Sequence, residues 1–444
     1  MKRLVACAAL LLLALPAAAA AASAAAENEV GGGFNLGLGV IDSDFYTAAD
    51  AYFIWRTETV KLGAQVPLRL MLTGADGVRI RRQDWDEASD FTRLLRYFDW
   101  HPNEEVHVRL SEPTAVTLGH GAIVDHFYNA TDLDHYKTAL RVAWQRPGFD
   151  LDVFANDVVR WEVMAARGGY KPLGTSTSWA RDLQVAATVA VDRAAPTGTP
   201  GLIDETNQPV VLRAPIWLYG VDADIPLWRG AQRQLLLYSD VVGMYHRPSF
   251  AGVPTGTSGT TGGWHLGLRL QLPSVAPDTD VTLRLEAVYM GHGYLPGWFD
   301  NLYEVERFHV QAAQNAEYLN KVAWAAQNTG PLGVRTQLDI VADKGLRLTA
   351  LLAWLGSDGL STQLWLTTPE MAGLTVRAHW GQQHLQTAAD WGALDRTAAL
   401  GEVRYRISAA LSASLQAGTR WQAKDDGYAA RRELFGAARF EWKL

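Results

Sequence analysis

Apolar and polar residues alternate along much of the chain, and the final segment shows this pattern most clearly. Counting back from the C-terminus, one parity carries Leu444, Trp442 and Phe440. The opposite parity carries charged residues such as Glu441 and Arg439. Because successive residues of a strand point to opposite faces, this pattern predicts a strand with one apolar and one charged face. An amphipathic edge strand of a soluble sheet is the alternative.

The same alternation recurs in segments of roughly ten residues, which is the length that a tilted strand needs to cross the hydrocarbon layer. The clearest examples lie within residues 137–145, 264–272, 281–289, 374–380, 402–407 and 411–421. A soluble β-sandwich can also alternate, but its strands are commonly shorter. We therefore predict an all-β fold, a transmembrane antiparallel β-barrel.

Strand candidates number about nineteen, whereas a closed single-chain bacterial barrel has an even number of strands. The expected count is about eighteen, with sixteen to twenty left open because the region between residues 100 and 215 is hard to divide. Connections alternate in length, as they do in a barrel with short periplasmic turns and long external loops. Short turns are expected at 146–148, 273–278 and 343–345, and long loops at 246–263, 292–331 and 384–396.

The N-terminus has the three parts of a signal peptide. A basic start precedes an apolar run up to Pro16 and a series of small residues up to Ala26. The expected domains are therefore a signal peptide, residues 1–26, and a barrel, residues 27–444. The sole cysteine, Cys7, stands before the apolar core of the signal, whereas a lipid-attachment site needs that core before the cysteine. Cys7 is therefore interpreted as a small residue of the signal.

Removal of the signal leaves 418 residues (444 minus 26) without a cysteine. With Lys2 and Arg3 gone, the formal charge is about −9 (38 basic minus 47 acidic residues), which argues against a nucleic-acid partner. No apolar stretch after Pro16 approaches the roughly 18 residues of a membrane helix, so a membrane crossing must use strands. The 17 Trp and 15 Tyr suit the aromatic girdles of a membrane barrel, although a soluble core could use them as well.

Charged side chains share the face opposite to the apolar one, and by parity we expect them to point into the lumen. They are Arg141, Arg269, Arg284, Glu286, Arg335, Asp339, Arg377, Glu402, Arg404, Arg406 and Arg420, with Arg109, Arg347, Arg439, Glu441, Asp150 and Asp152 in addition. A hydrated lumen tolerates such charges, whereas a lipid-facing charge costs roughly 2–4 kcal/mol. Two interpretations stay open: a charged pore that favours anions, and ion pairs between neighbouring strands that hold the wall together.

The longest loop, 292–331, opens with an aromatic segment and continues without Gly or Pro from Asn301 to Asn328. The second part predicts a helix of up to about twenty-five residues. The aromatic segment could fold into the barrel as a constriction, cap its outside or contact a neighbour. The candidate constriction residues are Tyr294, Trp298, Phe299 and Asp300.

Histidines near carboxylates raise the question of chemistry. Asp42, Asp44, His120, Asp125 and His126 form the one cluster that could serve a barrel-embedded hydrolase at the outer rim. Their spacing matches no metal site, and exposed loop histidines are the favoured interpretation. We therefore expect no catalytic residue, no metal and no cofactor.

The whole mature chain, through its pattern of strands, resembles the porins of the Gram-negative outer membrane. The residues Phe440, Trp442 and Leu444 resemble the signal read by the barrel assembly machinery, although that family usually ends in Phe or Trp. Residues 294–304 also resemble a stretch of uncharacterised myxobacterial barrel proteins. The porin resemblance implies contact with outer-membrane lipid and passage through the assembly machinery.

The leading functional hypothesis is a porin-like channel for passive diffusion of small polar solutes. Its more specific version is a channel that prefers anions. A barrel-embedded hydrolase and a structural or assembly component of the cell envelope are the alternatives. The sequence indicates neither the solute nor the oligomeric state.

Overall fold

The computed structural model describes residues 29–443, apart from gaps at 74–76, 113–114, 175–178, 198–201, 231–232, 247–259, 277, 309–318, 328–329, 343–344, 394–396 and 425–426. The expected signal peptide and Leu444 lie outside the described residues. The first strands are β1 (Glu29–Ile41), β2 (Asp44–Arg56), β3 (Val60–Met71), β4 (Arg79–Ile80), β5 (Leu95–Trp100), β6 (Val106–Ser111), β7 (Ala139–Arg146), β8 (Phe149–Ala155), β9 (Val163–Tyr170), β10 (Gln184–Pro196) and β11 (Arg213–Arg229).

The remaining strands are β12 (Gln234–His246), β13 (Thr260–Ala276), β14 (Thr279–Met290), β15 (Leu332–Ala342), β16 (Arg347–Trp354), β17 (Leu360–Thr367), β18 (Leu374–Leu385), β19 (Thr397–Arg406), β20 (Leu411–Lys424) and β21 (Gly427–Lys443). The helices are short: α2 (Tyr303–Glu306), α3 (Lys321–Ala325), and the 3₁₀ helices η1 (Arg82–Asp84), η2 (Ser89–Leu94), η3 (Trp179–Asp182), η4 (Gly356–Asp358) and η5 (Ala388–Asp390). No helix in the described part of the chain is long and apolar enough to span a membrane.

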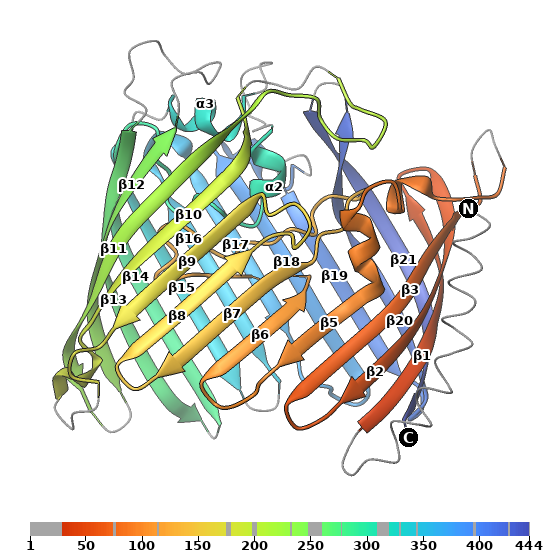
Figure 1. The fold of residues 1–444 in the computed structure, drawn as a ribbon, viewed down its shortest axis with the longest axis horizontal. Helices are drawn as coiled ribbons and strands as arrows, with labels where there is room; N and C mark the ends of the chain where they lie inside the picture. The colour runs from red at the N-terminus through yellow and green to blue at the C-terminus, as the bar shows by residue number, and fades with distance from the viewer. Residues whose placement is uncertain are drawn as a thin grey trace.

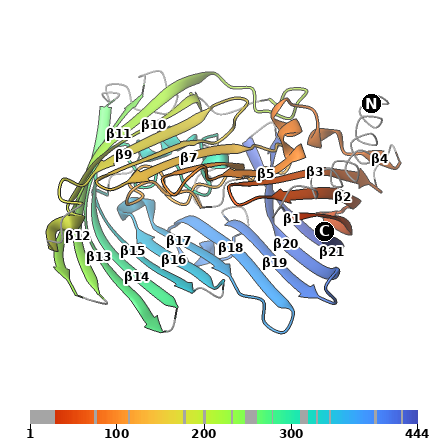
Figure 2. The same cartoon turned by 60° about the horizontal axis from the view of Figure 1, so that its bottom comes forward.

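The strands form a closed antiparallel barrel, seen as a ring in Figure 2. The ring closes where β21 pairs with β1, from Gly31↔Lys443 to Ile41↔Glu433. Of the 21 strands, β4 only extends the edge of β3, and β3 pairs directly with β5, so the wall has twenty strands (21 minus 1). The predicted fold class is confirmed, and the strand number lies two above the preferred eighteen and within the range left open.

The outer face of the wall is an apolar belt. Across the closing seam Phe34 faces Phe440, and these side chains are exposed, as is Leu36 on the next outward position of β1. The belt continues on the far side of the barrel with Val221 and Leu285. Because closure leaves no unpaired sheet edge and the exposed side chains are apolar, this surface matches the hydrocarbon layer of a bilayer.

The two ends of the barrel differ in the length of their connections. Short turns at 57–59, 101–105 and 147–148 lie at the end that holds the C-terminus, at the bottom of Figure 1. The opposite end carries the connections 72–94, 112–138 and 291–331. In outer-membrane barrels the short turns face the periplasm, which assigns the C-terminal end to that side. The expected turn at 273–278 is shorter than predicted, because β13 continues to Ala276.

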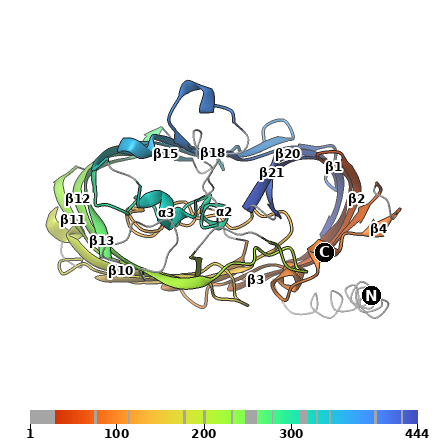
Figure 3. The same ribbon diagram turned by 90° about the horizontal axis from the view of Figure 1, so that it is seen from above.

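Two of the long connections fold into the barrel. We call residues 112–138 the first lumen loop and residues 291–331 the second lumen loop; Figure 3 shows α2 and α3 of the second inside the ring of strands. Phe127, Trp298 and Phe299 of these loops are fully buried and belong to one apolar cluster with inward side chains such as Leu218 and Met244 of the wall. Part of the lumen is therefore a dry core rather than a water-filled channel.

The second lumen loop is less helical than expected. In its described residues, the single helix predicted from Asn301 to Asn328 is replaced by α2 and α3, while residues 309–318 lie outside the described chain. Asn320 explains why α3 begins anew, since its side-chain oxygen accepts a hydrogen bond from the Ala323 amide at 2.9 Å. An asparagine that caps a helix start ends any continuous helix through that position.

Candidate functional site

A cavity of about 340 Å³ remains between the first lumen loop and one side of the barrel wall; we call it the lumen cavity. The wall side comes from β1, β2, β3, β19, β20 and β21. Its charged lining residues are Asp50, Arg69, Arg93, Glu112, Asp132, His135, Lys137, Glu402, Arg420, Glu433 and Arg439. The lumen cavity is therefore small, and many of its lining side chains are charged.

Arginines gather on the wall of the lumen cavity around Tyr52. The guanidinium carbon of Arg96 lies 4.7 Å from the centre of the Tyr52 ring, and that of Arg439 lies 6.0 Å from it. Arg439 also donates to Asn35 at 2.7 Å and forms an ion pair with Glu441 at 3.7 Å. An aromatic face attracts cations, so one ring holds two like charges beside the cavity.

The carboxylates of the lumen cavity are each engaged by a neighbour. Glu433 accepts from the Tyr46 hydroxyl at 2.7 Å and from Arg420 at 3.3 Å. Glu402 accepts from Arg404 at 3.0 Å. The acids therefore hold wall side chains in place rather than presenting free negative charge.

The first lumen loop forms one boundary of the cavity because it is attached to the wall at β20. The β19–β20 ladder ends at Leu400↔Gly418, which leaves the upper part of β20 without a β19 partner. There Trp421 donates its amide to Thr131 at 2.8 Å and accepts from the Leu133 amide at 2.7 Å. The loop thus completes a sheet edge that would otherwise carry unpaired backbone groups.

On the opposite side the first lumen loop is anchored by His120. Its Nδ1 lies 3.0 Å from Asp240 and its Nε2 lies 3.0 Å from Asp224, two inward carboxylates of β12 and β11. Burial by itself lowers the pKa of His120, but the hydrogen bonds to Asp224 and Asp240 outweigh it and raise the pKa to about 9. His120 is therefore a cation at neutral pH, clamped between two anions.

Beside this anchor lies a buried network centred on Glu286 of β14. Its carboxylate accepts from Arg335 at 3.1 Å, from His265 at 2.9 Å and from the Tyr238 hydroxyl at 2.6 Å. Arg335 also forms an ion pair with Asp125 of the first lumen loop. Every charge in this network has a partner, as enclosed charges require.

The two lumen loops are joined to each other as well. Lys137 of the first binds Glu304 of the second at 2.5 Å. Within the second loop, Lys321 binds Asp300 at 2.6 Å and Glu306 at 2.8 Å. These contacts make the two loops one packed body inside the barrel.

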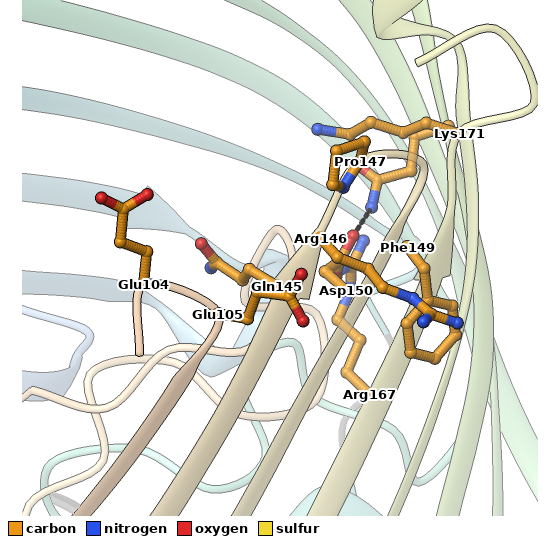
Figure 4. Close-up of a pocket in the computed structure, with 10 residues that line it drawn as sticks. Glu104, Glu105, Gln145, Arg146, Pro147, Phe149, Asp150, Arg167 and Lys171 are labelled. Carbon is orange, nitrogen blue, oxygen red and sulfur yellow. Dashed lines mark hydrogen bonds and ion pairs between the residues drawn. The ribbon is translucent and has the colours of Figure 1, made fainter. Parts of the chain in front are cut away.

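A second cavity, of about 630 Å³, opens at the periplasmic mouth, and we call it the mouth cavity. Figure 4 shows its side chains on the ends of neighbouring strands, among them Glu105, Asp150 and Arg167. A smaller space of about 230 Å³ shares Asp150 and Arg167 with it and ends at Gly119 and His120 of the first lumen loop. On this side of the barrel the lumen is therefore blocked by the loop.

The charged residues predicted for the lumen fall into several regions. Glu402 and Arg420 line the lumen cavity, and Arg404 binds Glu402 beside it at 3.0 Å. Arg284, Glu286 and Arg335 are buried against the first lumen loop, where Arg284 donates to the His120 carbonyl and to Gln337. Arg269, Asp339, Arg377 and Arg406 lie toward the periplasmic end. Their partners are Asp224 for Arg269, Gln337 and Thr349 for Asp339, Glu402 for Arg377, and Glu370 for Arg406. Arg141 lies near the start of β7, away from the 147–148 turn, and binds Asp152.

The aromatic segment of the second lumen loop does lie inside the barrel, but away from the lumen cavity. Tyr294, Trp298 and Phe299 are fully buried, and Tyr294 donates to the Ala122 carbonyl at 2.8 Å. Asp300 is held by Lys321. These side chains fill the blocked part of the lumen, and their role as a constriction remains a proposal.

The candidate hydrolase cluster is not assembled. Asp42 lies in the β1–β2 connection, where it binds Arg431 at 2.7 Å, and Asp44 is exposed. His120, Asp125 and His126 are buried in the first lumen loop, so the prediction of exposed loop histidines was wrong. The reason is that a polar loop can enter a polar lumen, where its charges find partners on the wall.

The terminal strand has the predicted faces, with Phe440 outward and Arg439 inward. Trp442 pairs across the seam with Gly32. Sequence reasoning missed Tyr52, although apolar side chains such as Phe45, Phe53 and Trp55 recur at alternate positions of β2, and it missed Arg96 of the short strand β5. It also passed over Asp99, His101 and His107, which cluster at the periplasmic end.

No family model matches the sequence, and no curated protein sequence matches it. Among solved structures, the chain is similar to OprD of Pseudomonas aeruginosa at 12% identity, with 94% of this chain and 95% of that chain covered and a TM-score of 0.34. It is also similar to OccAB3 of Acinetobacter baumannii at 10% identity, with 95% and 100% covered and a TM-score of 0.35.

These scores are low, so the assignment of the barrel rests on its own strand pairing and outer belt. A closed antiparallel barrel with an apolar belt has the architecture of an outer-membrane β-barrel. The local resemblance to myxobacterial proteins stays a prediction.

Proposed function

We propose that the protein is a passive diffusion channel for small polar solutes, which pass beside the first lumen loop through the lumen cavity and are preferentially anions. The size of the cavity, about 340 Å³, supports a limit to small molecules, because it lies near the lower end of the ~300–1,000 Å³ of small-molecule sites. The observation that carries the proposal is this polar space beside an otherwise packed lumen.

The arrangement of charge supports the preference for anions. Arg96 and Arg439 share the face of Tyr52, and the side chains of Arg377 and Arg406, near the periplasmic end, are 57% and 56% exposed. The acids are engaged by wall neighbours, as described for Glu402 and Glu433. Accessible positive charge along a narrow path lowers the energy of an anion more than that of a cation.

Planar-bilayer recordings test the proposal. We expect conductance steps from folded protein, and reversal potentials in a salt gradient that indicate anion preference. Arg404→Ala combined with Arg406→Ala should weaken that preference, while Arg229→Ala, which removes an arginine paired with Asp182 away from the lumen cavity, should leave it unchanged. Folded protein without conductance steps would contradict the channel.

A structural or assembly role in the envelope is the second candidate, and the packed lumen loops favour it. The same recordings separate the two, since a structural barrel gives no steps. The enzymatic alternative has less support, because both ring nitrogens of His120 are already bound to carboxylates and leave none for a nucleophile.

A further inference from the structure

We propose that Asp99, His101 and His107 bind one divalent transition-metal ion at the periplasmic end of the barrel. The three residues belong to β5, β6 and the short turn between them. Each offers one ligand atom, and these atoms lie within 4.8 Å of one another. The proposal concerns metal binding and does not depend on channel activity.

The hairpin brings these side chains to one face. Asp99 and His101 are two residues apart, so they project to the same side at the end of β5. Asp99 pairs with Arg109 across the hairpin, which places His107, two residues before Arg109, on that side as well. Side chains on one face of adjacent strands are near neighbours, close enough to share an ion.

The ring nitrogens converge on one carboxylate. His107 Nε2 lies 3.1 Å from Asp99 Oδ1, and His101 Nε2 is in contact with the same oxygen. The two imidazole rings stack with centres 3.9 Å apart and planes inclined by 21°. Two nitrogens and one oxygen therefore point toward a common region rather than toward separate partners.

The backbone around the site is fixed. The His101 amide donates to the Thr59 carbonyl at 2.8 Å, which ties the turn to the preceding β2–β3 turn. Asn103 Oδ1 accepts from the amides of Glu105 and Val106 at 3.0 and 2.9 Å and so closes the turn. Ligands on a fixed turn lose little conformational freedom when an ion binds.

The ligand set and its access to water define the class of ion. Two imidazole nitrogens and one carboxylate oxygen suit Zn²⁺, Cu²⁺ or Ni²⁺ better than Mg²⁺ or Ca²⁺, which prefer oxygen ligands. The side chains of His101 and His107 are 39% and 38% exposed, so water can complete the coordination. An ion can enter from the periplasm without unfolding the hairpin.

The charged residues around Asp99, His101 and His107 favour the binding of a cation. Arg109, the direct partner of Asp99, donates instead to Ser111 at 3.1 Å, further along the strand. Glu104 and Glu105 of the same turn line the mouth cavity and add negative charge (Figure 4). The region is therefore not already neutralised by its arginine.

Within the described residues, a second group of one histidine and two aspartates differs from the hairpin group because its side chains already have partners. His120, Asp222 and Asp240 also lie within 4.8 Å of one another. There Arg167 already binds Asp222 at 2.6 Å, and both nitrogens of His120 are engaged by carboxylates. That group is a closed set of ion pairs, whereas the hairpin group retains open positions.

Titration calorimetry of untagged, folded protein with ZnCl₂ tests the proposal. We expect one site per chain in the wild type and at least a tenfold weaker affinity in the double variant His101→Ala, His107→Ala. His292→Ala, which removes an exposed histidine of the second lumen loop, is the matched control and should bind as the wild type does. The heat-dependent shift in gel mobility of a folded barrel verifies that each variant is folded.

A spectroscopic arm identifies the ligands. With one equivalent of CuCl₂, electron paramagnetic resonance should show coupling to nitrogen in the wild type, which is lost in the double variant. Asp99→Asn should weaken Zn²⁺ binding while nitrogen coupling to Cu²⁺ persists. Equal Zn²⁺ affinity in the wild type and the double variant, or no binding at either, would overturn the proposal.

Discussion

Arg335 of β15 forms an ion pair with Asp125 of the first lumen loop, and both side chains are almost fully enclosed. The same guanidinium also binds Glu286 on the neighbouring strand at 3.1 Å. One cation therefore holds two buried anions, one on the wall and one on the loop. Arg335 is therefore one of the attachments that fix the loop, beside His120 and the backbone contacts of Trp421.

Removing that charge should release the loop. Arg335→Met removes the guanidinium that binds both Asp125 and Glu286, and breaking a buried pair typically costs about 3–5 kcal/mol. We expect a lower unfolding midpoint in denaturant together with larger, noisier conductance steps. Arg229→Ala, which breaks the half-buried pair with Asp182, should change the unfolding free energy by about 0–1 kcal/mol. Equal midpoints for the two variants would contradict this role of Arg335.

The attachment of the first lumen loop should weaken in alkali. The pKa of His120 in the fold, about 9, exceeds the value near 6.5 of an exposed histidine. Its contribution is therefore complete below about pH 6.5 and is lost as the pH rises through about 9. Proteolysis of the loop measured between pH 6 and pH 10 should accelerate near pH 9.

His120→Gln supplies the control for this titration, since it cannot carry the charge and should give fast proteolysis with little change near pH 9. Burial lowers the pKa of His135, but its partner Asp132 raises it to about 10, so the same loop also loosens at still higher pH. A wild-type profile without a step between pH 8 and pH 10 would contradict the role of His120.

The closing seam tolerates a methyl group at one glycine and not at another. A Cβ on Gly37 would lie 2.4 Å from the Phe435 ring and 2.6 Å from the Gly436 carbonyl oxygen. Gly37→Ala should therefore destabilise the barrel by about 1–3 kcal/mol, as overpacking does. A Cβ on Gly436 would meet no atom closer than 4.0 Å, so Gly436→Ala should stay within about 0.5 kcal/mol of the wild type. Denaturant unfolding followed by gel mobility compares them.

The contact between the two lumen loops can be measured as a coupling. Lys137→Met and Glu304→Gln each break the 2.5 Å pair, and the double variant removes both partners. We expect the summed losses of unfolding free energy in the two single variants to exceed the loss in the double variant. The coupling energy from denaturant unfolding should be about 0.5–3 kcal/mol. Strictly additive losses would show that the loops are held by the wall alone.

The barrel was predictable because alternation is a local property of each strand. Long strands such as β13, β14 and β21 cross the bilayer and repeat the pattern many times. β5 and β6 are six residues each, too short for two-residue periodicity to stand out, and β6 lies in the region 100–215 where the count was uncertain.

Parity assigns each wall charge to one face of its strand, but it cannot predict what covers that charge. Glu286 and Glu402 are both wall charges, yet Glu286 is enclosed beside the first lumen loop and Glu402 lines the lumen cavity. Loop placement depends on contacts far apart in sequence, such as Lys137 with Glu304. A loop rich in His and Asp looks like an external loop until its partners across the barrel are known.

The candidate metal site could have been predicted from the sequence. Asp99-Trp100-His101 followed by His107 after a short turn places alternate ligands at the tip of a hairpin. The histidines within residues 120–135 were considered as candidates, whereas His101 and His107 were not. The convergence of both rings on one carboxylate oxygen needed the structure.

The pairing of Trp421 with the first lumen loop has a consequence for the order of assembly. The loop lies between β6 and β7, early in the chain, whereas its backbone partner lies in β20, near the end. The loop cannot take its final place until the last hairpin has arrived, so insertion of the loop and completion of the wall are the same late event. During biogenesis a nascent barrel without its C-terminal hairpin would hold an unfilled lumen, and contacts so distant in sequence make this step slow.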